Sequence, residues 1–426
     1  MKTDMQTYEA TCVDQTETHW DVAVDVSKET LGWYAEADGT RGRVIHHQGV
    51  FGNHSEPILA GIAHLQALAA QLGYTGVRII CEPTGGYERR LLRAARQRGC
   101  ATALVNGEAV SKMQVVESND TGKSDTKDPR TILLLAKWKK TRIDRHLQGE
   151  WLLLRELNAR YDRLERDSTR CKNRIHKLLV SLFGELSFKN DWLFTSEAAA
   201  TVVELYGLNA AAMVQDGRTR FTARLRRRHV RTVTIERLWD DADRSALVTA
   251  DPAWLQLLAV DVQELFDELR RLRIRMQATR TQMIGLATSL HTRGATRLQP
   301  QPDLISPFML ARILGETGPL TDFNGFRQLW RYGGLNLRPH QSGTMQGQKR
   351  QAKRGRSRLR HVLAQAVLKR VVRGQLYGEY YHRKRDAGMC GGKAMTAVAR
   401  KFLKLLFGLE HSEIPFDPAR VFRAAA

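Results

Sequence analysis

The chain has 426 residues, 42% of them hydrophobic, and its 67 Lys and Arg against 45 Asp and Glu give a net charge of +22. This length predicts about two to four domains, and the charge favours a polyanionic partner such as nucleic acid, with a merely solubilising surface as the alternative. The five cysteines form no C-x-x-C pair, which argues against a disulfide framework and a zinc ribbon and favours a reducing cytoplasm. No apolar run reaches the roughly 18 residues of a membrane span, which argues against a membrane protein.

The N-terminal third alternates strand-like and helix-like segments. Residues 19–39 predict two strands with a tight connection, because Trp20, Val22, Val24 and Val26 alternate with polar or small residues. Further strands are expected in "GRVIHHQGVFGN", "VRIICEP" and "ATALVN", and amphipathic helices in "HSEPILAGIAHLQALAAQLG" and "GGYERRLLRAARQRG". This order predicts an α/β layer with a mixed sheet.

Two heptad-like seams predict long helices in the middle of the chain. Apolar residues recur at steps of three, four or seven from Leu154 to Leu182, and again after Asp251 and Pro252, an expected N-cap and first helical residue. The two helices are expected to pair within one chain or as a coiled coil with another copy. The segment between them, at about 187–250, looks helical and irregular, and its basic cluster is either a solvated face or a phosphate contact. That cluster includes Arg226, Arg227 and Arg228.

From about residue 300 the chain is expected to be mostly helical, with a glycine-rich middle. Ser342 there precedes Gly343 and stands within a run of eight cations and no acid. It is either a loop serine beside a solvated patch or a nucleophile where a phosphate lies. A serine needs an activating neighbour, and the surrounding cations could hold the phosphate and stabilise its charge. These cations are Arg338, Lys349, Arg350, Lys353, Arg354, Arg356, Arg358 and Arg360.

Four carboxylates stand where predicted strands end or helices begin: Asp25, Glu82, Asp125 and Asp128. Carboxylates that converge in space could hold a pair of Mg²⁺ or Mn²⁺ ions for phosphoryl transfer. Each residue also has a structural alternative. Asp128 could cap a helix, Asp25 could cap a turn, and Glu82 could pair with a nearby arginine.

The order of several motifs resembles one family, the transposases of the insertion sequence 110 family, which are bridge-RNA-guided recombinases of bacterial mobile elements. The N-terminal motifs are "VDVSK" (24–28), "EPTGGYERRL" (82–91) and "KSDTKDPRTILLLA" (123–136). The C-terminal motifs are "ARILGETGPLTDFNGFRQLWRYGGLNLRPHQSG", "KRGRSRLRHVL" and "GGKAMTAVARKFLKLL". The chain departs from the family at Pro129, where alanine is usual, and in "QPQPDLISPFML", where a Gly-x-Gly hairpin is usual.

The resemblance implies three domains. These are an α/β RNase H-like, RuvC-like domain at 18–145, long coiled-coil helices with the basic insert at 146–298, and a mainly α-helical Tnp domain at 299–426. It implies that Asp25, Glu82, Asp125 and Asp128 bind Mg²⁺ or Mn²⁺ and that Ser342 forms a covalent phosphoserine link to DNA.

The implied partners are donor and target DNA, a bridge-type RNA, and further copies of the chain in a dimer to tetramer. The eight cations around Ser342, together with Lys123, Arg226, Arg227 and Arg228, are the expected nucleic-acid contacts. A metal-dependent RuvC-like junction nuclease with a structural serine, and a nucleic-acid-binding protein without catalysis, are the competing interpretations.

Overall fold

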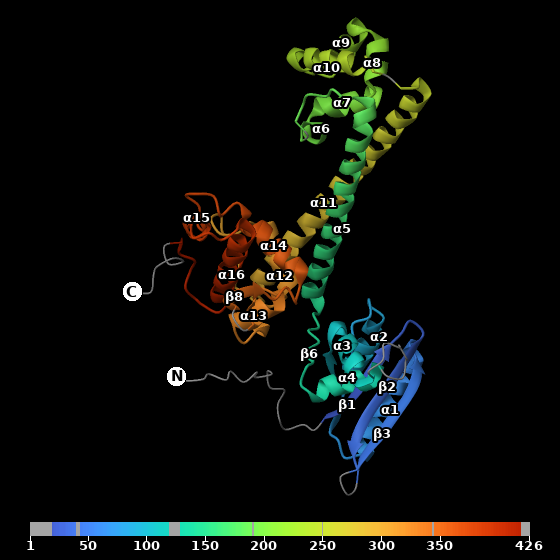
Figure 1. The fold of residues 1–426 in the computed structure, drawn as a ribbon, viewed down its shortest axis with the longest axis vertical. Helices are drawn as coiled ribbons and strands as arrows, with labels where there is room; N and C mark the ends of the chain where they lie inside the picture. Colours follow the sequence, from blue (N-terminus) through green and yellow to red (C-terminus); the bar gives the residue numbers. More distant parts are fainter. Residues whose placement is uncertain are drawn as a thin grey trace. The chain divides into compact units, whose positions relative to one another are not determined.

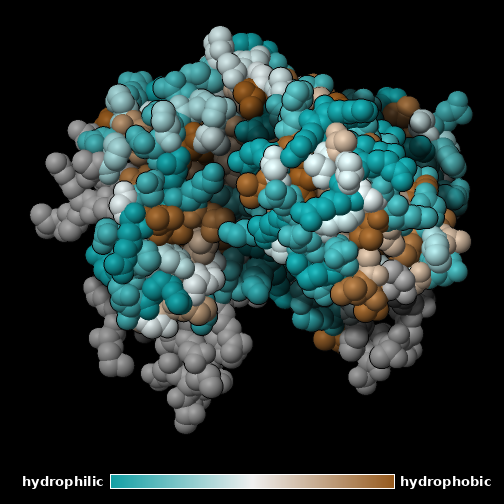
Figure 2. Space-filling model, turned by 90° about the horizontal axis from the view of Figure 1, so that it is seen from above, coloured by the Kyte–Doolittle hydropathy of each residue, from teal (hydrophilic) through white to brown (hydrophobic). Residues whose placement is uncertain are grey.

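The computed structural model describes residues 19–39, 43–118, 128–189, 191–248, 250–342 and 345–418. The chain divides into two compact units, Met1–His146 and Leu147–Ala426, shown as a ribbon in Figure 1. Hydrophilic residues cover most of the face seen in Figure 2, as expected when 26% of the residues are charged. Among the described residues, no helix is long and apolar enough to cross a membrane.

The first unit contains a mixed sheet with the strand order β3-β2-β1-β4-β5-β6. In this sheet β1 pairs antiparallel with β2 and parallel with β4, and β4 pairs parallel with β5. This is the strand arrangement of an RNase H-like fold, which confirms the predicted fold class. The strands are β1 (His19–Val26), β2 (Thr30–Asp38), β3 (Val44–Gly52), β4 (Gly76–Cys81), β5 (Ala101–Leu104) and β6 (Arg142–Ile143).

Helices cover both faces of this sheet. Successive side chains of a strand point to opposite faces, so Val22 and Val24 pack against α1 and α2 while Ala23 packs on the side of α3 and α4. The alternation in the sequence thus supplies a hydrophobic layer to each face. The helices are α1 (Ser55–Gln71), α2 (Glu88–Gln97), α3 (Gly107–Ser118) and α4 (Asp128–Lys137).

Two long helices organise the second unit: α5 (Gly149–Leu182) and α11 (Pro252–Thr292). They pack along each other within one chain, the first of the two arrangements expected from the sequence, as Figure 1 shows. The carboxylate of Asp251 accepts a hydrogen bond from the Trp254 amide at 3.0 Å, and Pro252 stands in the first turn, so α11 begins as predicted. At 1.5 Å per residue, α11 is about 60 Å long.

The basic insert folds into a compact helical cluster around the C-terminal end of α5 and the N-terminal end of α11. Its core buries Phe221, Leu225 and Leu238. The irregular pattern in the sequence arises because the helices are short. Two of them begin at capping residues, Ser196 and Asn209, whose side chains accept hydrogen bonds from backbone amides. The helices are α6 (Trp192–Thr195), α7 (Glu197–Tyr206), α8 (Ala210–Asp216), α9 (Arg218–Arg227) and α10 (Thr232–Ser245).

The rest of the second unit is mainly helical and contains one β-hairpin. The helix α12 is buried around nearly its whole circumference, so it forms the centre of this region. The hairpin was not expected from the sequence, because its polar, glycine-containing strands show no alternation of apolar residues. The elements are α12 (Pro307–Thr317), η2 (Leu320–Asp322), α13 (Phe326–Gly333), β7 (Leu337–Ser342), β8 (Met345–Gln351), α14 (Ser357–Leu368), α15 (Gly378–Asp386) and α16 (Gly391–Glu410).

Candidate active site

Asp25 and Glu82 are neighbours at one edge of the sheet. The parallel strands β1 and β4 are in register with Val24 opposite Cys81, and Asp25 and Glu82 are the next residues of the two segments. Adjacent strands lie about 4.8 Å apart, and both residues belong to the face that α3 and α4 cover. Two carboxylates are therefore brought to the carboxyl ends of adjacent strands.

Two glycines make room around this pair. A Cβ atom on Gly107, the first residue of α3, would lie 2.9 Å from the carboxyl carbon of Glu82, so the Glu82 carboxylate rests against the start of α3. The positive end of the α3 dipole favours a negative charge there. Gly32 is the β2 residue opposite Asp25, and a Cβ on it meets no described atom within 4 Å. Within the described residues, the face beside Asp25 is open.

The helix α4 is fixed across this face by two contacts to β2. The Arg130 guanidinium lies 5.0 Å from the centre of the Tyr34 ring, and Tyr34 pairs with Ala23 of β1. Lys137, the last residue of α4, forms an ion pair with Glu36, which is further from the carboxyl end of β1. Burial and a 2.9 Å hydrogen bond to Glu36 raise the pKa of Tyr34 to about 12, so the phenol stays protonated and donates this bond.

These contacts orient α4 antiparallel to β1. Its first residue, Asp128, therefore lies toward the edge that carries Asp25 and Glu82. Pro129 occupies the first turn, where a proline is well tolerated, so this departure from the family is compatible with the helix. Asp125 and Lys123 lie outside the described residues.

The donor set at this edge fits a hard divalent cation. The described part of the chain contains no group of three or more His, Cys, Asp or Glu side chains placed to hold a metal ion. It does place Asp25 and Glu82 at adjacent strand ends, and α4 begins with Asp128 toward the same edge. Carboxylate oxygens are the ligands that Mg²⁺ and Mn²⁺ prefer.

Ser342 is the last residue of β7, near the tip of the hairpin. It pairs with Met345 of β8, and the register is irregular between His340 and Ser342. The base of the hairpin is anchored by a 2.9 Å hydrogen bond from the Ala352 amide to the Asn336 carbonyl. The serine therefore stands at the far end of a strand pair whose base is fixed.

The anchor at the hairpin base depends on three glycines and an arginine. Arg360 donates hydrogen bonds to the carbonyls of Gly333 at 2.9 Å and Gly355 at 3.3 Å. Gly334 has a φ of +65°, and a Cβ there would lie 2.7 Å from the Arg354 carbonyl oxygen. A side chain at Gly334 would push these two segments apart.

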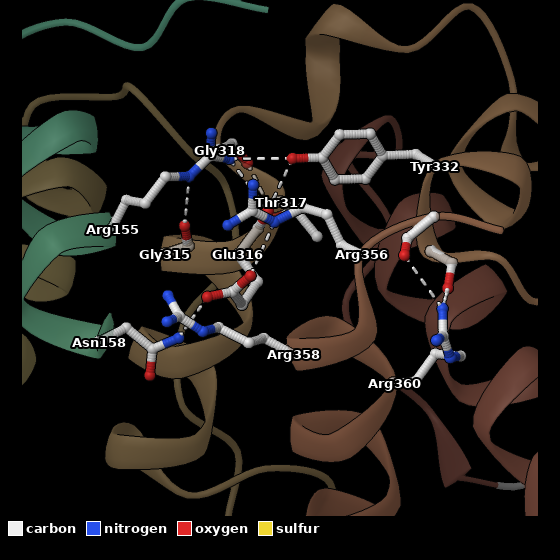
Figure 3. A network of polar contacts seen from close by, with 12 residues as sticks. Arg155, Asn158, Gly315, Glu316, Thr317, Gly318, Tyr332, Arg356, Arg358 and Arg360 are labelled. Carbon is white, nitrogen blue, oxygen red and sulfur yellow. Dashed lines mark hydrogen bonds and ion pairs between the residues drawn. The ribbon is translucent and has the colours of Figure 1, made fainter. Parts of the chain in front are cut away.

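A buried ion-pair network joins this region to α5 (Figure 3). Glu316 is fully buried, and its carboxylate accepts hydrogen bonds from Arg356 at 2.7 Å and Asn158 at 2.8 Å. Arg155 of α5 donates to the carbonyls of Gly315 and Glu316 at 3.1 Å and 3.0 Å. Although burial disfavours the charge of Arg356, Tyr332 and Glu316 raise its pKa above the ordinary value.

The network predicts a large stability cost for Glu316→Ala. Removing the Glu316 carboxylate leaves the buried Asn158 amide and the half-buried Arg356 guanidinium without their partner, and breaking a buried pair in this way costs about 3–5 kcal/mol. We expect that loss in the free energy of unfolding, measured by chemical denaturation. Glu204→Ala is the matched control, because it breaks the exposed 2.6 Å pair with Arg228 and is expected to cost less than about 1 kcal/mol. Equal costs for the two variants would contradict this account of Glu316.

The described cations that were expected to contact nucleic acid fall into three groups. Arg356 and Arg360 have the internal partners described above, and Arg358 lies 3.6 Å from the Asp162 carboxylate. Lys353, Arg354, Arg226 and Arg227 are exposed, and Arg228 is exposed but paired with Glu204. Arg338, Lys349 and Arg350 belong to the hairpin strands.

Sequence reasoning missed the residues that support the carboxylates. Gly107 and Gly32 create space, and Tyr34 and Arg130 hold α4 in place. A glycine directly after the "ATALVN" strand was the only visible signal for Gly107. The other contacts join segments far apart in the chain, which periodicity does not reveal.

Comparisons with known proteins match both units. A family model for DEDD transposases of IS110, described as "Transposase", matches residues 22–184, and a second, described as "Transposase IS116/IS110/IS902 family", matches residues 304–382. A Streptomyces clavuligerus protein named "Insertion element IS116 uncharacterized 44.8 kDa protein" is 25% identical over 354 residues, which cover 80% of this chain and 84% of that protein.

Solved structures of Thermus thermophilus RuvC, one of them in complex with a Holliday junction substrate, match the chain weakly. Each is 13% identical, covers 29% of this chain and 98% of the RuvC chain, and has a TM-score of 0.21. A similarity at this TM-score supports no argument about the present chain.

Proposed function

The chain belongs to the IS116/IS110/IS902 family of transposases, enzymes that act on DNA, and from this premise we propose that it cuts and rejoins DNA through a phosphoserine link at Ser342. In this proposal Asp25, Glu82, Asp125 and Asp128 bind the divalent ions that the reaction needs. The observation that carries it is the pair of carboxylates at adjacent strand ends, with α4 directed to the same edge.

The carboxylates and the serine have separate tasks. When bound by the tetrad, Mg²⁺ or Mn²⁺ would supply Lewis-acid stabilisation of phosphate oxygens and lower the pKa of an adjacent hydroxyl. Glu82 is held against the start of α3, and the pairing of β1 with β4 fixes the backbone positions of both Asp25 and Glu82. This rigidity supports a role as ligands, because a metal site needs its donors held in place.

Ser342 would attack the phosphorus atom of one DNA linkage with its Oγ. The bond to one deoxyribose oxygen breaks, and that oxygen leaves with a proton as a free hydroxyl group. A DNA hydroxyl later attacks the phosphoserine, which restores the diester and releases the serine. The exposed cations Lys353 and Arg354, close to the hairpin base, would contact DNA phosphates that flank the linkage attacked by Ser342.

The choice of DNA would come from a bridge-type RNA, and the active particle would be a dimer to tetramer in which another copy supplies the carboxylates. The net charge of +22 and the exposed Arg226 and Arg227 support a large nucleic-acid partner. Such a partner would be recognised through backbone and shape, while base pairing selects the sequence.

Sequencing the RNA that co-purifies with the protein tests this proposal. We expect one defined RNA species, and we expect RNase treatment to reduce the joining of element-end DNA to the background level. The assay would contain Mg²⁺ in both arms, with heat-inactivated RNase as the control. Joining that continues at the same rate after RNase treatment would contradict the guide-RNA proposal.

A further inference from the structure

The loop that follows Glu82 is rigid and presents an aromatic side chain to solvent. Gly85 and Gly86 have φ values of +71° and +117°, which glycine adopts at little cost. The carboxylate of Glu88 accepts hydrogen bonds from the backbone amides of Thr84 at 3.1 Å and Gly86 at 2.9 Å. At the end of this loop, Tyr87 is 51% exposed.

A buried asparagine ties this loop to the turn that follows Asp25. Asn53 is only 3% exposed, and its side-chain amide donates to the Ser27 carbonyl at 2.8 Å and to the Tyr87 carbonyl at 3.3 Å. Ser27 follows Asp25 by two residues, so one side chain connects the two segments that carry the adjacent carboxylates. Tyr87 is thereby held at the same edge of the sheet as the candidate metal site.

Three arginines follow Tyr87 on the outer face of α2. Arg89, Arg90 and Arg93 are exposed, while the opposite face buries Leu91 and other apolar residues against the sheet. Positions three and four apart on a helix are neighbours, so these like charges repel one another. Arg89 and Arg90 also stand in the first turn, where the helix dipole disfavours a cation. Within the described residues, no salt bridge relieves this repulsion, and an anion would.

An exposed aromatic ring beside clustered arginines suits a single strand of nucleic acid. An unpaired base can stack on the ring while the guanidinium groups contact the phosphates on either side. A duplex would use the arginines but would leave the tyrosine without a role, because its bases are already stacked. Because Tyr87 lies at the strand ends that carry Asp25 and Glu82, we expect the unpaired DNA strand to lie next to the linkage that is cleaved.

We propose that Tyr87, Arg89, Arg90 and Arg93 form a platform for the unpaired DNA strand next to the linkage that is cleaved. This inference rests on the proposed function for the identity of the strand. The platform begins at the strand ends that carry the carboxylates, while α2 itself covers the opposite face of the sheet, and we assign the platform residues no role in the phosphoryl transfer itself.

Photocrosslinking gives a local test on the full-length protein. A 20-nucleotide oligo(dT) that contains 5-iodouracil would be irradiated with the protein in EDTA, and the crosslinked peptides would be identified by mass spectrometry. We expect a crosslink in the peptide that contains Tyr87, and we expect Tyr87→Ala to remove it. Trp138→Ala is the matched control, because Trp138 is 54% exposed in the same unit. A crosslink pattern without this peptide would overturn the proposal.

Binding measurements complete the test. By fluorescence anisotropy in EDTA, we expect Tyr87→Ala to weaken oligo(dT) binding about tenfold and to leave binding of a 20-base-pair duplex unchanged. Tyr87→Phe keeps the ring and is expected to bind like the wild type. Arg90→Ala is expected to reduce the dependence of log affinity on log salt by about one. Equal losses for Tyr87→Ala and Trp138→Ala, a loss with Tyr87→Phe, or tighter binding of oligo(rU) than oligo(dT) would each overturn the proposal.

These results do not depend on the proposed catalysis. Neither measurement contains a divalent ion or requires cleavage, so a negative result for the platform would not argue against the Ser342 chemistry, which is tested separately. Conversely, loss of the serine mechanism would leave an observed crosslink at Tyr87 in place.

Discussion

Replacing Ser342 with alanine is expected to abolish the covalent protein–DNA species and to reduce recombination at least roughly a thousandfold. The alanine variant lacks the Oγ atom that would form the phosphoserine bond, so the proposed link cannot form. The measurement is a denaturing gel of protein incubated with labelled element-end DNA, Mg²⁺ and its co-purified RNA. The wild type is expected to give a band that survives denaturation and disappears after protease treatment.

Ser357→Ala provides the matched control for this experiment. Ser357 is an exposed serine in the same basic segment, at the start of α14, so its loss changes composition but leaves the hairpin tip intact. It is expected to form the adduct at the wild-type level. If Ser342→Ala instead cleaved branched DNA at the wild-type rate, the metal-dependent nuclease would be the better interpretation.

The second large effect is expected from the carboxylates at the strand ends. Asp25→Asn and Glu82→Gln keep the shape of each side chain but remove its charge, so the affinity for a divalent ion falls. We expect strand cleavage to drop by about a hundredfold or more, with the remaining activity requiring more Mg²⁺. Cleavage of labelled DNA across a Mg²⁺ titration measures both quantities.

Asp21 offers a control on the same strand and the same face as Asp25. Its carboxylate accepts a hydrogen bond from Arg78 at 2.7 Å, so its charge is paired with an arginine of the neighbouring strand. Asp21→Asn is therefore expected to lower the free energy of unfolding and to retain cleavage per folded molecule. An equal loss of cleavage in Asp21→Asn and Asp25→Asn would argue against a special role for Asp25.

Local patterns predicted five of the strands of the first unit but not α3 or β6. Alternation in β1 placed Val22 and Val24 on one face and Asp25 on the other, and the end of the "VRIIC" strand placed Glu82 at an edge. Their adjacency then follows from the parallel pairing of β1 with β4, which is consistent with the mixed sheet predicted from the α/β order of segments. Strand-end carboxylates are therefore accessible to sequence reasoning.

The second unit was harder to predict because its determinants are long-range contacts. In sequence, Arg356 is one more cation in a basic run, but in the structure it pairs with the buried Glu316, which also binds Asn158 of α5. Charge density cannot distinguish such a structural arginine from a ligand contact. The hairpin that carries Ser342 was missed because the sequence of its strands shows no alternation of apolar and polar residues.

The adduct assay with Asp125→Asn tests the central claim most directly, namely that the serine and the carboxylates act on one DNA linkage. The variant keeps Ser342 and the whole second unit unchanged, and its folding would be checked by circular dichroism. Our account predicts no covalent species in the presence of Mg²⁺, RNA and element-end DNA, because the serine cannot react without the carboxylate site. Formation of the adduct at the wild-type rate would contradict it and would mean that the two sets of residues work independently.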